Sequence, residues 1–128
     1  MDKNLSVEDI QNILRNTEVK LGSTHTRLSL PIINRIYKKM KAEIKFPPIK
    51  VQDSFICNGH HRYVASLLAN YNLEKIQWNY ISKTNVIGWE TVSFDENDWD
   101  NIDEIDRYNK QDAEFNNITL DKIVELLK

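Results

Sequence analysis

Hydrophobic and polar residues recur along this chain with two different periods, which predicts a mixture of short helices and short strands. Apolar residues stand at helical spacing after Ser6, a residue type that caps helices, and again from Ser29 to the proline pair 47–48. A third helix is expected after Gly59 and a last one from Thr119. The predicted apolar stripes of the first three helices are Ile10, Ile13 and Leu14; Ile32, Ile33, Ile36, Met40 and Ile44; and Tyr63, Val64, Leu67 and Leu68.

Shorter apolar runs between these helices predict strands. Residues 49–51 and 55–57 flank a short turn and are expected to pair as a hairpin. Residues 75–81 alternate between apolar and polar side chains, and residues 18–21 and 86–94 show weaker versions of the same pattern. The order helix, strand, helix, hairpin, helix, strand is that of a small α+β domain. We therefore expect a short mixed sheet with helices packed around it and a helical C-terminal extension.

The length and composition are those of one globular domain. With 128 residues, of which 41% are hydrophobic and 28% charged, the chain can bury a core without disulfides or metals. Its single cysteine, Cys57, lies in an expected strand and is interpreted as a buried small hydrophobe. The cysteine and histidine spacing contains no zinc motif. No apolar run reaches membrane-spanning length and no signal-peptide core is found, so a cytoplasmic protein without membrane contact is expected.

The net charge of −2 conceals two halves of opposite sign. Up to Tyr63 the chain has eleven Lys and Arg against six Asp and Glu, and from Val64 on it has six against thirteen. The first half is therefore a candidate for contact with phosphates, although two solvated faces would give the same charges. The acidic run 95–106 lacks the spacing of an EF-hand and is expected to be a solvated loop. The alternatives are that it covers the basic half or mimics nucleic acid toward a partner.

The candidate chemistry is concentrated in Asn58-Gly59-His60-His61-Arg62, where the third helix begins. The first N–H groups of a helix have no partner inside the helix and carry a partial positive charge, so they favour phosphates and other anions. Arg62 can grip two phosphate oxygens, while His60 or His61 can donate to a phosphate or act as an acid or base. Gly59 is expected to supply a positive φ angle or a close approach. In the structural alternative, Arg62 pairs with an acidic residue of the tail and His60 caps the turn.

The segment 18–81 resembles the ParB/sulfiredoxin superfamily, whose members carry G-x-x-R or G-x-H-R at a glycine turn before a helix, as Gly59-His60-His61-Arg62 does here. The resemblance implies one domain over 1–128, with a core at 18–81 and an acidic extension at 82–128. His60 stands where sulfiredoxins have their catalytic cysteine, so reduction of sulfinic acids is not expected. The Glu-Asn-x-x-Arg motif of CTP-binding ParB proteins and a following helix-turn-helix are also missing. Free-serine kinases and ParB-like nuclease or toxin domains remain the most similar members.

This resemblance implies a nucleotide-binding protein that catalyses phosphotransfer or nucleotide hydrolysis, with ATP or another nucleotide and Mg²⁺ as cofactors. The turn 58–62 would hold the phosphates, and Arg27, with Thr26 beside it, would assist from a loop across the site. The resemblance to serine kinases implies Glu18 as a carboxylate base. Lys38 is a further candidate for contact with phosphate or nucleic acid. The structural interpretations are a cap at Thr26 and a solvated helix face at Lys38.

Two other functions remain open at this point. In the first, the chain is a nuclease or toxin domain in which His60 or His61 acts as acid or base on a phosphodiester. In the second, it is a binding module without catalysis, which recognises a nucleotide or a protein partner.

Overall fold

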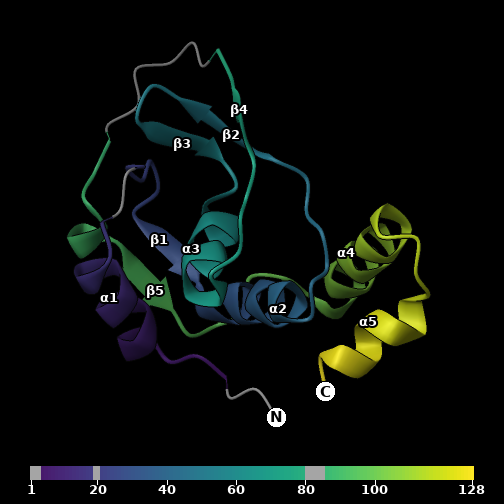
Figure 1. Cartoon of the computed structure of the whole chain (residues 1–128). Helices are drawn as coiled ribbons and strands as arrows, with labels where there is room; N and C mark the ends of the chain where they lie inside the picture. The colour runs from purple at the N-terminus through teal and green to yellow at the C-terminus, as the bar shows by residue number, and fades with distance from the viewer. Residues whose placement is uncertain (1–3, 19–20, 80–85) are drawn as a thin grey trace.

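The chain folds as a small α+β domain, as predicted, and a computed structural model describes residues 4–18, 21–79 and 86–128 (Figure 1). The described part contains five α-helices and short strands. The elements in chain order are α1 (Val7–Asn16), β1 (Arg27–Ser29), α2 (Leu30–Lys41), β2 (Ile49–Gln52), β3 (Phe55–Asn58), α3 (His60–Ala69), β4 (Lys75–Gln77), the 3-10 helix η1 (Trp89–Thr91), β5 (Ser93–Asp95), α4 (Ile102–Phe115) and α5 (Leu120–Leu126).

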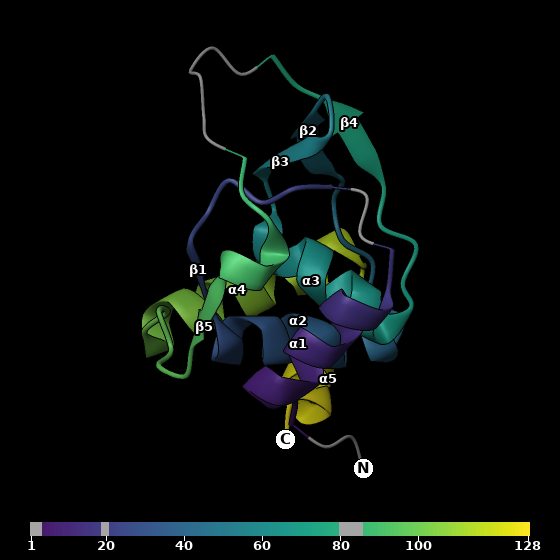
Figure 2. The same cartoon turned by 90° about the vertical axis from the view of Figure 1, so that its left-hand side faces the viewer.

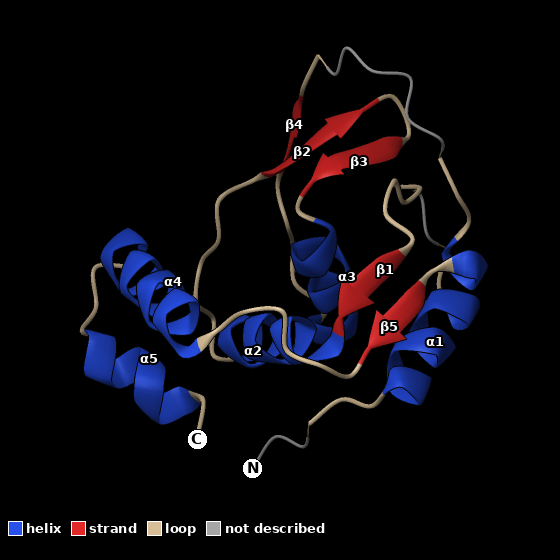
Figure 3. Ribbon diagram, turned by 180° about the vertical axis from the view of Figure 1, so that it is seen from behind, coloured by secondary structure: helices blue, strands red, loops and turns tan. Residues whose placement is uncertain are grey.

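The strands form two small sheets. β2 pairs antiparallel with β3, which confirms the predicted hairpin, and parallel with β4 on its other side, so the strand order is β3-β2-β4. β1 and β5 form a separate parallel pair. The three-stranded sheet lies at one end of the molecule and the helices lie at the other (Figures 2 and 3), and β1 contacts α3.

The helix boundaries follow local capping chemistry. Ser6 and Asp9 form a reciprocal capping box at the start of α1, and the side chain of Thr119 caps α5, as predicted. α3 ends at Asn70, which has a left-handed conformation. α2 ends at Lys41, earlier than the predicted stripe that runs to Ile44, because Glu43 has a positive φ of 66° and breaks the helical repeat.

Several predicted strands are shorter than expected or lie elsewhere. β4 covers only the first three residues of 75–81, and residues 80 and 81 lie outside the described part. The run 86–94 contains an isolated bridge at Ile87, η1 and most of β5 instead of one strand. Positions 19 and 20 of the run 18–21 are likewise not described, and neither Glu18 nor Leu21 is in a strand. β1, in contrast, begins inside the predicted loop.

Two hydrophobic clusters hold these elements together. The larger one joins α1, α2, α3 and the strands, and Ile10, Ile33, Ile56 and Val64 are completely buried in it. The smaller one contains Ile44, Ala113 and Ile123 and attaches α4 and α5 to the chain that follows α2. None of the helices in the described part is both long and apolar enough to cross a bilayer.

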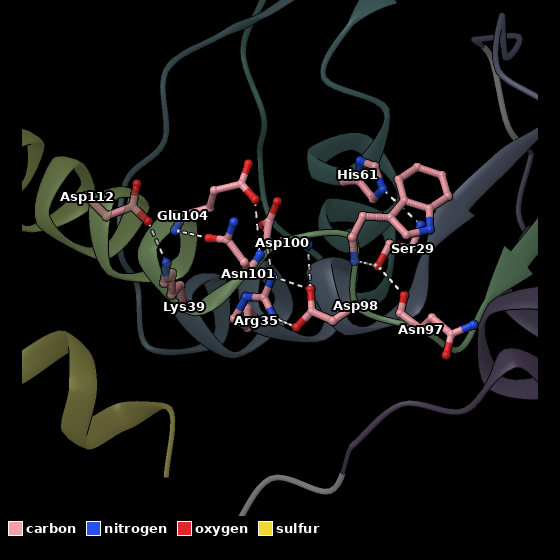
Figure 4. A network of polar contacts seen from close by, with 11 residues as sticks. Ser29, Arg35, Lys39, His61, Asn97, Asp98, Asp100, Asn101, Glu104 and Asp112 are labelled. Carbon is pink, nitrogen blue, oxygen red and sulfur yellow. Dashed lines mark hydrogen bonds and ion pairs between the residues drawn. The ribbon is translucent and has the colours of Figure 1, made fainter.

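The expectation of a solvated acidic loop at 95–106 holds only in part: most of these residues are exposed, but three of the aspartates pair with basic residues. Asp95 pairs with Arg27 at 2.7 Å, and Asp98 and Asp100 both pair with Arg35 on α2 (Figure 4). The segment then enters α4, a helix that the hydrophobic pattern did not predict. Opposite charges on distant parts of the chain therefore bring the acidic extension onto the basic half, which was one of the alternatives.

Candidate functional site

A cavity of about 590 Å³ lies at the N-terminal end of α3. Its walls are the turn 57–62, the linker 46–47, His25, one face of α2 and one face of α4. The cavity therefore lies where the predicted core meets the C-terminal extension.

The sequence-predicted residues divide into two groups around this cavity. All five residues of the turn 58–62 line it. Arg27, Thr26, Lys38 and Glu18 do not line it, and Arg27 is held by Asp95 at the edge of the β1–β5 pair. From the loop before β1, it is the exposed ring of His25 that reaches the cavity. Roles for Arg27, Thr26, Lys38 and Glu18 in ligand binding stay predictions without support from their positions.

Gly59 is required at the start of α3 for two reasons, which confirms the expectation from the sequence. Its φ angle is +104°, a conformation that residues with a Cβ rarely adopt. A Cβ atom there would lie 2.3 Å from Cγ2 of Ile49. As the N-cap, Gly59 offers no side chain to the first turn, and that turn contains no acidic residue. The positive end of the α3 dipole therefore faces the cavity without a carboxylate cap.

His60 connects the turn to the loop before β1. Its Nε2 accepts the backbone N–H of Thr24 at 3.0 Å, so the neutral ring carries its proton on Nδ1. The side chain is buried, and this burial, together with His25 and His61, lowers the pKa of His60 to about 3. The ring of His25 stacks on it with centroids 3.9 Å apart. A neutral His60 in this arrangement is a structural acceptor.

His61 makes the equivalent contact one residue later. Its Nε2 accepts the backbone N–H of Ser29 at 3.0 Å, and its ring meets Trp99 edge-on with centroids 5.6 Å apart. Burial is the main cause that lowers the pKa of His61 to about 4, with smaller contributions from His25 and Arg35. The two histidines thus anchor both ends of the segment 24–29 to the start of α3.

The side chain of Arg62 contacts both the linker before β2 and the turn before α3. Its guanidinium donates to the carbonyl of Pro47 at 2.8 Å and to Oδ1 of Asn58 at 3.1 Å. Among the described residues, no carboxylate lies within ion-pair distance of it, so the predicted pairing with the acidic tail is not seen. Burial lowers the pKa of Arg62 and the charge of Asp112 raises it, but a guanidinium remains protonated. The cavity is therefore lined by a positive charge that no carboxylate of the described chain contacts directly.

Sequence reasoning missed the charged residues on the opposite walls. Lys39 is 3% exposed, and its Nζ lies 2.6 Å from Oδ2 of Asp112 on α4. One turn earlier, Arg35 binds Asp100 at 2.9 Å (Figure 4). The signal was the spacing of Arg35 and Lys39, which are four residues apart and share a helix face.

The remaining chemistry of the lining favours neither a metal nor a thiol nucleophile. No group of three or more His, Cys, Asp or Glu side chains in the described part of the chain is placed to hold an ion. Cys57 is half-buried instead of fully buried and lines the wall, and burial raises the pKa of its thiol, so the thiol is protonated at neutral pH.

Comparison of the chain with models of protein families, with curated proteins and with solved structures found no match in any of the three.

Proposed function

We propose that this protein binds a nucleotide through its phosphates at the N-terminus of α3. One observation carries the proposal: the uncapped start of α3 and the guanidinium of Arg62 line the same cavity. In the described chain, that guanidinium has no carboxylate partner and donates to a backbone carbonyl instead. Helix N–H groups bind anions through their partial charge, and an arginine adds a planar fork of donors. Phosphate groups satisfy both kinds of donor.

Among the three functions predicted from the sequence, binding has the most support. A histidine that acts as a base must offer a lone pair on a ring nitrogen, and the Nε2 lone pair of both His60 and His61 already accepts a backbone N–H. The low pKa values also keep both rings neutral at pH 7. The nuclease hypothesis therefore has no observation in its favour. Phosphotransfer or hydrolysis with Mg²⁺, membership of the ParB/sulfiredoxin superfamily and a cytoplasmic location remain predictions.

The proposal is tested by thermal unfolding with ATP, ADP, CTP and GTP, each with and without Mg²⁺. A ligand present at a hundred times its dissociation constant stabilises the native state by about 2.7 kcal/mol, a readable shift in Tm. We expect at least one nucleotide to raise the Tm of the wild-type protein. Arg62→Gln removes the charge but keeps a donor for Pro47, and it should abolish the shift.

The matched control is Arg15→Gln, which removes a positive charge from the exposed surface of α1, outside this cavity. It should leave the nucleotide shift unchanged. Absence of a shift with all four nucleotides would overturn the proposal. An undiminished shift in folded Arg62→Gln would show that the nucleotide binds elsewhere.

A further inference from the structure

We propose that Tyr108 of α4 holds the base of the bound nucleotide, so that the C-terminal extension supplies the ligand-selecting part of the site. This inference rests on the proposed phosphate site and adds the residue that distinguishes a nucleotide from a bare polyphosphate. Tyr108 lines the cavity, yet it is 42% exposed. It therefore presents a large ring to a space that a ligand can fill.

The lining of the cavity contains both polar and apolar side chains. The turn 59–62 supplies helix N–H groups and the charge of Arg62, whereas Ile32, Ile36 and Phe46 join Tyr108 as apolar lining. Inorganic phosphate or polyphosphate satisfies only the polar part. A ligand that carries both an anionic group and a planar ring satisfies both, and about 590 Å³ is in the usual range for small-molecule sites.

Ion pairs hold the helix that carries Tyr108. Asp112 lies four residues after Tyr108 and so shares its helix face, and its carboxylate is 2.6 Å from the buried Lys39. Before α4, Asp100 binds Arg35, and a capping box of Asn101 and Glu104 starts the helix (Figure 4). The ring is therefore carried by an anchored helix, which reduces the entropy lost on binding.

The chemistry of the ring suits a nucleobase. Every base has a π-face that stacks on an aromatic side chain, and such stacking tolerates different bases. The guanidinium of Arg107 lies over one face of the Tyr108 ring, 5.1 Å from its centroid, so a base would stack on the other face. A base on Tyr108 would remove an exposed apolar surface from water.

The test compares two ligands by calorimetric titration of the full chain: ATP and inorganic tripolyphosphate, which shares the phosphate chain but lacks the base. Tyr108→Ala should weaken ATP binding by roughly 5- to 150-fold, the range expected for one stacked base. It should change tripolyphosphate binding by less than about twofold, because the phosphate contacts stay in place. Tyr108→Phe, which keeps the ring, should retain ATP affinity.

Phe115→Ala is the matched control, because Phe115 is an exposed aromatic residue of the same helix that does not line this cavity. It should bind both ligands as the wild type does. Equal affinity of Tyr108→Ala and the wild type for ATP would overturn the inference, and so would equal losses for both ligands. If Arg62→Gln still loses both ligands in that case, the phosphate site stands and only the role of Tyr108 fails. If the wild type binds neither tripolyphosphate nor any of the four nucleotides, both proposals fail; if it binds another of the four and not ATP, that nucleotide replaces ATP in the same comparison.

Discussion

Nε2 of His60 accepts the backbone N–H of Thr24 at 3.0 Å, although the two residues are 36 positions apart in the chain. The ring is 2% exposed and forms a bridge between the start of α3 and the loop before β1. In the sequence, a histidine at a glycine turn indicates a possible acid or base. In the folded chain, the one acceptor nitrogen of the neutral ring is used in a structural hydrogen bond. His61 accepts the backbone N–H of Ser29 in the same way, so the two histidines together connect the start of α3 to the segment 24–29.

Replacement of His60 should therefore affect stability more than ligand affinity. His60→Ala leaves the Thr24 N–H without its acceptor and opens space in a buried site, and we expect a loss of about 2 to 4 kcal/mol in the free energy of unfolding. His25→Ala, which removes an exposed ring, should cost much less. Urea denaturation measures both. A His60→Ala protein of normal stability that has lost a catalytic activity would contradict the structural role.

The two buried histidines should also make stability depend on pH. Their folded pKa values of about 3 and about 4 lie below the unfolded value near 6.5, so between pH 6.5 and 4 the unfolded state binds more protons. The stability that the two histidines contribute is therefore fully present above pH 6.5. It decreases as the pH is lowered, by up to about 1.4 kcal/mol per pH unit for each histidine. Urea denaturation at about pH 7.5, 6, 5 and 4.5 measures this slope. The double variant His60→Gln/His61→Gln should have a flatter profile, and an identical slope would disprove the assignment.

The buried Lys39–Asp112 pair should be costly to break from one side. Asp112→Ala leaves the ammonium of Lys39, which is 3% exposed, without its carboxylate, and we expect a loss of about 3 kcal/mol. Asp106→Ala removes an aspartate from an exposed pair with Lys110 on the same helix and should cost less than about 1 kcal/mol. Chemical denaturation compares the two.

A second variant separates the buried charge from loss of packing. Lys39→Met/Asp112→Ala removes both charges and should recover part of the stability lost in Asp112→Ala. A double variant less stable than the single one would show that the unpaired ammonium is not the cause of the loss in Asp112→Ala.

Gly59 should tolerate no side chain. Gly59→Ala forces a left-handed φ on alanine and places its Cβ against Ile49, and we expect a loss of about 2 to 4 kcal/mol in unfolding free energy. Gly88→Ala is the control, because its φ is −73° and the atoms nearest to the added Cβ belong to the carboxylate end of the exposed Glu90, which can move. Thermal unfolding compares the variants. Equal stability of Gly59→Ala and wild type would contradict the left-handed turn at the start of α3.

Features that depend on neighbouring residues could be predicted from the sequence alone. The capping of α1 by Ser6, the hairpin of β2 and β3 and the need for glycine at position 59 all follow from local backbone chemistry. The turn 58–62 could be predicted as a candidate site for the same reason, since its residues are contiguous and lie at the start of a helix. α4 was missed because its apolar residues are few and three of them are exposed, Ile102, Tyr108 and Phe115.

The contacts of these residues, in contrast, emerge only when the chain is folded. Lys39 and Asp112 are 73 positions apart, and β1 pairs with β5 through strands of three residues, too short to show a period in the sequence. The same holds for the hydrogen bonds that His60 and His61 accept from Thr24 and Ser29. The role of each side chain depends on which distant segment packs against it. Which side chains are buried, and which residues they contact, depends on packing between segments far apart in the chain. This packing also places the acidic extension against the core, where it forms one wall of the cavity.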